Sequence, residues 1–384
     1  MKVAVLGYGT VGAGVYSMLS DAPGMEAGPV LVRPGKAVES FMVSDAALIF
    51  GDPTVDAVVE TLGGLDPAYS YGMRALEAGK HFITANKAMV ASHGLELAAL
   101  ARETGAAFLF SAACGGGVPF LHNLALSAET DRIEAVSGIL NGTTNYMLDA
   151  MQRRSLSYGD ALREAQSLGY AESDPTADVS GLDALRKMQL ACAVAFGVLP
   201  QSGMLCEGME HFTAADVEDI QSRGLVCRLM ARGSRAGESV SAYVEPVLFP
   251  RAAPESSVFT NNNMARYTGK RCGSIVLMGQ GAGRFPTASA VLRDLSAAQQ
   301  GARSMFPENC RAAEADNREA VHSYYIRTGG FAAVRLPLRS VLAQGEVVRA
   351  VTEPMSAEKM HALAQNIRKD GNDLFFAALE EELC

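Results

Sequence analysis

Three glycines near the N-terminus constrain the fold more than any other feature of this 384-residue chain. They are spaced as GxGxxG between an apolar run at 2–6 and a helical pattern at 10–20. In such a strand–turn–helix unit the first glycine allows the tight turn, the second admits a pyrophosphate, and the third lets helix and strand pack. The pattern predicts a dinucleotide-binding Rossmann domain whose helix N-terminus faces the anion. The residues expected at the pyrophosphate are Gly7, Gly9, Thr10, Val11 and Gly12.

Two basic residues follow the second predicted strand, which covers residues 29–33. In a Rossmann domain this strand ends beside the adenosine ribose, where an acidic side chain commonly binds the 2′-hydroxyl of NAD. Here the chain has Arg33 and Lys36 instead. Positive groups suit the 2′-phosphate of NADP, although each residue could also be an ordinary solvated cation. The sequence therefore favours NADP as the cofactor and leaves NAD possible.

Polar residues follow two further predicted strands. Residues 55–60 are followed by Thr61 and Gly63, and residues 81–84 are followed closely by Lys87. Ligands of open α/β sheets lie outside the carboxyl ends of the strands. We therefore expect these side chains near the nicotinamide, although Lys87 could otherwise be a surface lysine at a helix start.

A second glycine-rich turn occurs late in the chain. It follows an apolar strand at 274–278 and precedes a helix that begins near Pro286 and ends near 299. The backbone at Gly281 could approach the nucleotide, or the glycines could form a simple connector. We expect this helix to dock on the Rossmann domain.

A carboxylate and a lysine stand at the entrance to a long apolar helix. Asp183 and Lys187 are four residues apart and so share one helix face, and residues 188–196 contain only one strongly polar side chain, Gln189. A helix that is apolar on nearly every face is normally buried. A lysine at the edge of a dry interior needs a partner or a catalytic role. The alternative is an acidic capping loop with one ordinary ion pair.

The middle of the chain has the character of a substrate domain. A predicted strand at 132–140 leads into Asn141, Gly142 and Thr143, whose polar groups could bind a carboxylate at a helix start or simply cap that helix. Strands at 225–231 and 239–249 are expected to add to a second sheet. A dimer through this sheet would cover its other face.

The composition indicates an ordinary globular protein that binds small molecules. Hydrophobic residues make up 48% of the chain, and the formal net charge is −9. An acidic surface does not attract nucleic acid or an anionic membrane. There is no signal-peptide pattern, no apolar run long enough for a membrane span, and no metal-type spacing among the seven cysteines, so we expect a cytoplasmic protein with reduced thiols.

We predict an α/β chain with three domains. Residues 1–112 and 283–317 form the dinucleotide-binding domain, and residues 113–282 form the α+β substrate and dimerisation domain. Residues 318–384 follow a strand, amphipathic stretch, strand, helix, strand order and form a small α+β appendage.

Six motifs in order resemble those of the homoserine dehydrogenase family. They are GYGTVG, ETLGG, TANK, NGTTNY, GYAESDPTADVSGLDALRK and GQGAGRFPTASAVLRDL, and the resemblance covers about residues 1–317. It implies reversible, NAD(P)-dependent interconversion of L-homoserine and L-aspartate 4-semialdehyde, on the route to threonine, methionine and isoleucine. It also implies a homodimer or a homotetramer.

The resemblance assigns roles to four charged residues. It places the catalytic lysine at Lys187, a second active-site lysine at Lys87, and substrate ligands at Glu172 and Asp183, with Asp178 in the same motif. A cation beside the substrate oxygen would stabilise alkoxide charge and exchange a proton. The carboxylates would hold the substrate ammonium.

Two departures from the family pattern limit what is carried over. The family commonly has a glutamate before a glycine loop, where it helps to bind a monovalent cation, whereas this chain reads SAACGGGVP over residues 111–119 and has no acidic side chain there. The backbone carbonyls of Cys114, Gly116 and Val118 could still act as ligands. Because the acidic side chain is missing, we expect no strong sodium or potassium dependence. The appendage resembles a shortened ACT domain without its glycine-bearing ligand turn, so threonine feedback is not expected.

Two other functions are weighed against this one. A phosphorylating semialdehyde dehydrogenase would use Cys114 as its nucleophile, but it would leave the acidic groups at 172–183 without a role. A non-catalytic NADP sensor with 318–384 as its effector module would not need both lysines.

Overall fold

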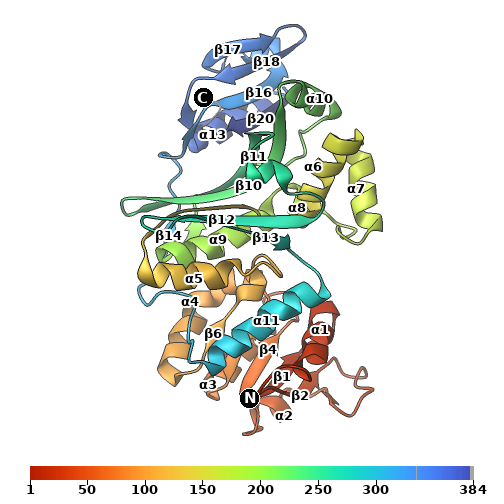
Figure 1. Ribbon diagram of the computed structural model, residues 1–384, viewed down its shortest axis with the longest axis vertical. Helices are drawn as coiled ribbons and strands as arrows, with labels where there is room; N and C mark the ends of the chain where they lie inside the picture. The colour runs from red at the N-terminus through yellow and green to blue at the C-terminus, as the bar shows by residue number, and fades with distance from the viewer. Residues whose placement is uncertain (334, 381–384) are drawn as a thin grey trace. The chain divides into compact units, whose positions relative to one another are not determined.

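A six-stranded parallel sheet forms the centre of the first of two compact units, in the order β3-β2-β1-β4-β5-β6 (Figure 1). Residues 3–6 and 57–60 are completely buried, as expected for central strands of a parallel sheet covered on both faces. The strands are β1 (Lys2–Leu6), β2 (Glu26–Leu31), β3 (Met42–Val43), β4 (Ala57–Glu60), β5 (His81–Thr84) and β6 (Phe108–Leu109). This is the parallel sheet of the predicted Rossmann domain.

The computed structural model describes residues 1–333 and 335–380. Its first unit comprises Met1–Ile133, Gln189–Leu199 and Gly279–Arg311, and the second comprises Glu134–Met188, Pro200–Met278 and the described residues after Arg311. The predicted domain boundaries at 112, 282 and 317 remain a proposal. Residues 381–384 of the expected third domain lie outside the described residues. No helix among the described residues combines the length and apolarity needed to cross a bilayer.

Helices surround the parallel sheet within the first unit. The late helix docks on this unit as predicted, because α11 packs against α1, and a Cβ added at Gly14 would lie 2.9 Å from the Arg284 carbonyl oxygen. Figure 1 shows these two helices side by side. The helices are α1 (Thr10–Leu19), α2 (Ala47–Phe50), α3 (Ala68–Glu77), α4 (Lys87–Thr104), η1 (Ser111–Ala113), α5 (Phe120–Thr130) and α11 (Arg284–Gln299).

A ten-stranded mixed sheet organises the second unit, in the order β13-β12-β7-β10-β11-β20-β16-β18-β17, with β9 paired to β11. Its longest pair is the antiparallel hairpin β10–β11, whose two-residue loop begins at Gly237 with φ of +61°, a conformation that glycine adopts without strain. The strands are β7 (Ile133–Ile139), β9 (Leu205–Cys206), β10 (Leu225–Ala236), β11 (Ser239–Pro250), β12 (Asn262–Gly269), β13 (Gly273–Gln280), β16 (Tyr324–Gly329), β17 (Leu338–Ala343), β18 (Val347–Thr352) and β20 (Leu374–Leu379).

The remaining elements include the predicted apolar helix, α9. Its residues 190–194 are at most 1% exposed, which confirms that a helix apolar on nearly every face is buried. The other elements are α6 (Gly142–Arg154), α7 (Tyr158–Ser167), α8 (Thr176–Val179), α9 (Leu182–Phe196), α10 (Ala214–Ser222), η2 (Pro254–Ser257), α12 (Gly330–Ala333), α13 (Ala357–Lys369), and the short pairs β8 (Val198–Ser202) with β14 (Arg311–Glu314) and β15 (Val321–His322) with β19 (Met355–Ser356).

The carboxyl-terminal segment contains the predicted strands and helix, together with the short strand β19 and a longer strand, β17, that the pattern did not indicate. This additional strand, β17, lies at the edge of the sheet, is largely exposed, and pairs with β18 in an irregular register, so its sequence lacks a regular alternation. The segment is not separate from the larger sheet, because β20 pairs in parallel with β11 at Val247 and Leu248. Its similarity to an ACT domain stays a prediction.

Candidate active site

The glycine turn after β1 has the geometry that a bound pyrophosphate requires. Gly7 adopts φ of +99°, and a Cβ added at Gly12 would lie 2.1 Å from the Gly7 carbonyl oxygen, so neither position accommodates a side chain. A Cβ added at Gly9 would meet no protein atom within 4 Å. The backbone at Gly9 therefore faces open space at the N-terminus of α1, where Thr10 and Val11 begin the helix. The turn fits a dinucleotide phosphate.

A buried carboxylate that the sequence analysis did not single out organises the ends of two neighbouring strands. Glu60 is completely buried, and its Oε1 accepts hydrogen bonds from the amides of Leu62 (2.6 Å) and Gly63 (3.2 Å). Its Oε2 accepts one from the Thr84 hydroxyl at 2.5 Å. Burial raises the pKa of Glu60, and these hydrogen bonds oppose the rise. The sequence feature that could have indicated this role is the position of Glu60, the one acidic residue at the end of the otherwise apolar strand β4.

Thr61 holds the glycine turn in place. Its hydroxyl donates to the carbonyl oxygens of Leu6 at 3.0 Å and Gly7 at 3.3 Å. Its side chain therefore supports the cofactor turn by positioning the backbone of that turn.

Lys87 is the first residue of α4 and is half-buried. The preceding residue, Asn86, caps this helix by accepting from the Met89 amide at 3.2 Å, and its amide group donates to the Gly64 carbonyl at 2.6 Å. The end of β5 and the loop after β4 thereby fix the position from which the Lys87 side chain projects.

Arg33 and Lys36 lie on one exposed turn beyond β2. The Lys36 amide donates to the Arg33 carbonyl at 3.0 Å, with Pro34 and Gly35 between them and Gly35 at φ of +79°. Proline followed by a glycine with positive φ is typical of a type II turn. The turn at residues 33–36 presents two cations close together and contains no acidic residue.

The loop expected to offer carbonyl ligands packs against the late glycine segment of the same unit. Gly116 has φ of +52°, and a Cβ there would lie 2.4 Å from the Gly281 carbonyl oxygen. The Gly117 amide donates to the Gln280 carbonyl at 3.0 Å, and the Val118 carbonyl accepts from the Phe120 amide at 2.7 Å. Gly281 is buried and supports this loop; Cys114 is also buried.

Asp294 anchors the segment just before this loop and was not singled out from the sequence. Its carboxylate accepts from the Ser111 amide at 2.7 Å and from the Ser111 hydroxyl at 2.5 Å. Burial raises the pKa of Asp294 to about 7, against the effect of these hydrogen bonds. Ser111 therefore binds a buried acid from α11 just before the glycine loop.

In the second unit, Asn141 connects the acidic residues of the predicted substrate site. Its amide group donates to Asp178 Oδ1 at 2.7 Å and to Asp183 Oδ2 at 2.9 Å. Its Oδ1 accepts from the Thr144 amide at 2.8 Å, so the same residue caps α6. Ligand site and helix cap were alternatives in the sequence, and here the capping residue also joins the two carboxylates.

Lys187 completes this cluster. Its Nζ donates to Asp183 Oδ2 and to the Leu140 carbonyl, both at 2.6 Å, and the side chains of Lys187 and Asp183 are each only 12% exposed. Burial and the nearby Asp183 charge raise the pKa of Asp178, whereas the Asn141 hydrogen bond lowers it. The structure thus brings together an ammonium, two carboxylates and an amide. The Leu140 carbonyl is the member that no side-chain motif could reveal.

The other predicted substrate residues border the cluster. Thr143 donates its hydroxyl to the Tyr170 carbonyl at 2.6 Å, and a Cβ at Gly142 would lie 2.7 Å from the Asn261 carbonyl oxygen. Glu172 lies outside the hydrogen-bonded cluster: its side chain is exposed, and its carbonyl oxygen accepts from Gln166 at 3.1 Å. Thr143 and Gly142 therefore support the helix start, and Glu172 lies on the exposed loop before α8.

Comparison with known proteins agrees with this geometry. Residues 7–111 match the NAD-binding domain model of homoserine dehydrogenase, and residues 119–296 match the homoserine dehydrogenase model. The homoserine dehydrogenase of Corynebacterium glutamicum is 38% identical over 314 residues, 76% of this chain and 70% of that protein. The Synechocystis enzyme is 37% identical over 319 residues, 77% of this chain and 72% of that protein. A homoserine dehydrogenase structure from Thiobacillus denitrificans has a TM-score of 0.87 and 29% identity, covering 99% of this chain and 98% of that one.

The fold and these matches define a nicotinamide-dependent oxidoreductase that acts on a CH–OH group. The chain belongs to the homoserine dehydrogenase family. Its reaction is the reversible interconversion of L-homoserine and L-aspartate 4-semialdehyde in the biosynthesis of threonine, methionine and isoleucine, as the sequence motifs predicted.

A pair of glycine substitutions tests the pyrophosphate assignment. Gly12→Ala should destabilise the protein by about 1–3 kcal/mol, because the new methyl group overlaps the Gly7 carbonyl. Gly9→Ala should change the free energy of unfolding by less than about 0.5 kcal/mol but weaken cofactor binding, because its methyl group enters the space assigned to the phosphate. Urea unfolding and fluorescence titration with NADPH measure both effects. Undiminished NADPH binding by Gly9→Ala would contradict the assignment.

Proposed function

We propose that Lys187 is the catalytic lysine of this dehydrogenase. The observation that carries the proposal is the position of its nitrogen: the Lys187 side chain is 12% exposed, and Asp183 Oδ2 and the Leu140 carbonyl hold Nζ at 2.6 Å each. A lysine so oriented can present a fixed positive charge to a substrate oxygen. Its hydrogen-bond acceptors come from the same unit, so its position does not depend on bound substrate.

The chemistry requires such a group. Oxidation of the homoserine alcohol removes hydride from carbon and a proton from oxygen, and the nicotinamide cofactor accepts the hydride when bound. As the neutral amine, Lys187 accepts the proton of the substrate hydroxyl during oxidation; as the ammonium, it returns that proton and stabilises the negative charge on the substrate oxygen during reduction. Asp183 and the Leu140 carbonyl hold the lysine nitrogen in place during that exchange.

The remaining residues are proposed to bind and orient the substrate. Lys87 would orient the reacting oxygen and a water molecule. Glu172 and Asp183 would hold the substrate ammonium, with Asp178 and Asn141 positioning Asp183 through the shared amide. Support comes from the cluster geometry for Asp183, Asp178 and Asn141, and for Lys87 from its place at the start of α4 together with the motif resemblance. For Glu172, on the exposed loop, support comes from the motif resemblance alone.

Substitution of Lys187 tests the catalytic assignment. Lys187→Met should lower turnover by about 10²–10⁴-fold with cofactor affinity retained, because charge stabilisation and proton transfer are both lost. Lys187→Arg should keep the charge but also lose turnover, because a guanidinium does not release its proton. The exposed Lys359→Met is the matched control. Homoserine oxidation and NADPH titration are the measurements, with urea unfolding to confirm that each variant folds. Near-normal turnover of Lys187→Met would refute the role.

We propose NADP as the preferred cofactor. The support is the exposed turn at Arg33 and Lys36, which offers two cations to a 2′-phosphate. Arg33→Gln should reduce the ratio of kcat/KM for NADP to kcat/KM for NAD by about tenfold, because one charge-assisted hydrogen bond is lost. The control is Arg163→Gln, an exposed arginine on α7. A ratio that Arg33→Gln leaves unchanged would sink the proposal.

The glycine loop is proposed to have little dependence on sodium or potassium. The candidate ligands Cys114, Gly116 and Val118 supply carbonyl oxygens only, and the Val118 carbonyl already accepts from the Phe120 amide. Without an acidic side chain at this loop, a monovalent cation gains little charge stabilisation. The rate of homoserine oxidation, measured in buffers with and without potassium, should therefore be nearly the same.

We propose a homodimer through the second sheet, with a homotetramer as the alternative. The edge strand β13 supports this, because Val276 and Met278 on one face are 42% and 59% exposed. Introducing a charge at both positions, Val276→Asp with Met278→Asp, should shift sedimentation toward the monomer. Val341→Asp, on the opposite edge strand of the sheet, is the control. A parent chain that sediments as a monomer at micromolar concentration would contradict the proposal.

A further inference from the structure

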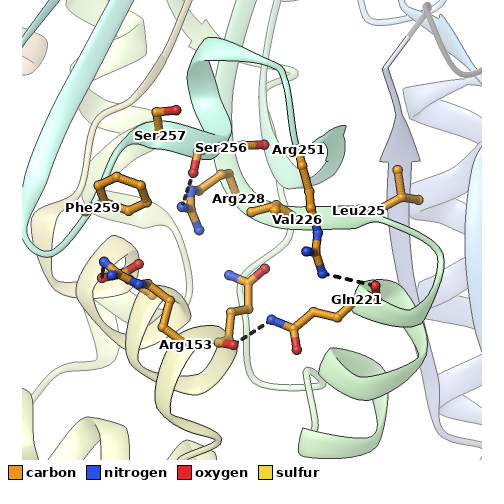
Figure 2. A pocket seen from close by; sticks show the side chains of 11 residues that line it. Arg153, Gln221, Leu225, Val226, Arg228, Arg251, Ser256, Ser257 and Phe259 are labelled. Carbon is orange, nitrogen blue, oxygen red and sulfur yellow. Dashed lines mark hydrogen bonds and ion pairs between the residues drawn. The ribbon is translucent and has the colours of Figure 1, made fainter.

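Three arginines converge on a pocket in the second unit that shares no lining residue with the Lys187 cluster. The cavity has a volume of about 310 Å³, and Arg153, Arg228 and Arg251 are among its lining residues. Figure 2 shows Arg153 projecting from α6, Arg228 from β10 and Arg251 from the segment after β11. Such a concentration of guanidinium groups in one concave surface favours a negatively charged ligand.

Arg228 is a buried cation whose direct hydrogen-bond partners are all neutral. It is 2% exposed, and its guanidinium donates to the carbonyl oxygens of Glu255 at 3.1 Å and of Cys227, Ser256 and Val258 at 3.2 Å each. These acceptors are neutral, and within residues 1–333 and 335–380 no carboxylate lies within 4.0 Å of it. Burial lowers the pKa of Arg228 because the charged form loses its hydration. An anion in the pocket would relieve this cost.

The one carboxylate that lines the pocket is itself incompletely bonded. Asp149 Oδ2 accepts from the Thr260 amide at 3.0 Å and lies 4.0 Å from Arg153 Nη1. Its Oδ1 is buried and has no hydrogen-bond donor in the described part of the chain. Three guanidiniums and one carboxylate leave the lining with a net charge of +2. A ligand with negative oxygens and a neighbouring donor, as in hydrogen phosphate, matches these groups.

The two outer arginines retain donors for such a ligand. Arg153 has a side chain that is 60% exposed, and it stacks over the Phe259 ring at 4.7 Å. Arg251 donates a single long hydrogen bond, 3.4 Å to the Gln221 carbonyl. Planar guanidiniums bind carboxylate and phosphate oxygens in pairs, which adds strength and geometric selectivity.

We propose that this pocket is a binding site for a small oxyanion, a phosphate or a carboxylate group held between Arg153 and Arg251 with Arg228 behind it. Neither the proposed catalytic role of Lys187 nor the cofactor site is required for it. Either chemistry would be recognised by the same guanidinium pair.

Calorimetric titration of the full chain tests the site. The cofactor site is first saturated with NADPH, so that phosphate cannot bind there, and ionic strength is held constant with sodium chloride because guanidinium–oxyanion contacts are screened by salt. Inorganic phosphate and succinate are titrated separately. We expect saturable binding of at least one, weakened about tenfold by Arg153→Gln and by Arg251→Gln. Saturation by phosphate alone assigns a tetrahedral ligand, and saturation by succinate alone assigns a carboxylate.

The control is Arg163→Gln, which removes an exposed arginine of the same unit outside the pocket. It should bind the anion like the parent chain. Urea unfolding shows whether the substituted proteins are folded; the buried Arg228 is left unchanged for this reason. The proposal is overturned if neither anion binds saturably, if both pocket variants bind like the parent, or if Arg163→Gln weakens binding as much as they do.

Discussion

The pairing of the Lys187 ammonium is the interaction on which the candidate active site depends. A lysine at 12% exposure is stable only if acceptors replace the water that it loses, and Asp183 and the Leu140 carbonyl do so at 2.6 Å. Asn141 extends this arrangement to Asp178. Removal of either member would take this ion pair away from the other charge while that charge stays largely buried, which is costly. A charged lysine can therefore stand at the start of the apolar helix α9 because Asp183 and the Leu140 carbonyl satisfy its hydrogen-bond donors.

The dinucleotide turn depends on a different constraint, the close approach of backbone to backbone. Gly12 fits because no side chain lies between α1 and the Gly7 carbonyl. Around it, Thr61 and Glu60 bind the backbone of neighbouring loops, so the polar groups at the strand ends serve structure as much as ligand binding. Thr61 was predicted to lie near the cofactor from its place at a strand end, and its hydroxyl already donates to the Leu6 and Gly7 carbonyl oxygens.

The second unit contains two buried cations, and the water that each one loses is replaced by a different kind of partner. Lys187 is neutralised by a carboxylate, whereas Arg228 is surrounded by neutral carbonyl oxygens. Carbonyl dipoles satisfy the donors of a guanidinium but do not cancel its charge. A positively charged pocket follows from the second arrangement, and the sequence contained no motif for it because its arginines come from three segments between 153 and 251.

Local patterns by themselves determined the parallel sheet, the glycine turn, the buried helix at 182–196 and the family, because period, glycine spacing and motif order are carried by neighbouring residues. Asp183 and Lys187 were predicted to share a face for the same reason. Only the tertiary structure decided that Asn141 joins Asp178 to Asp183, that Asp294 holds Ser111, and that β20 continues the sheet of β11. These contacts join residues 37 to 183 positions apart, or neighbouring strands that are distant in the sequence, and no local period encodes them.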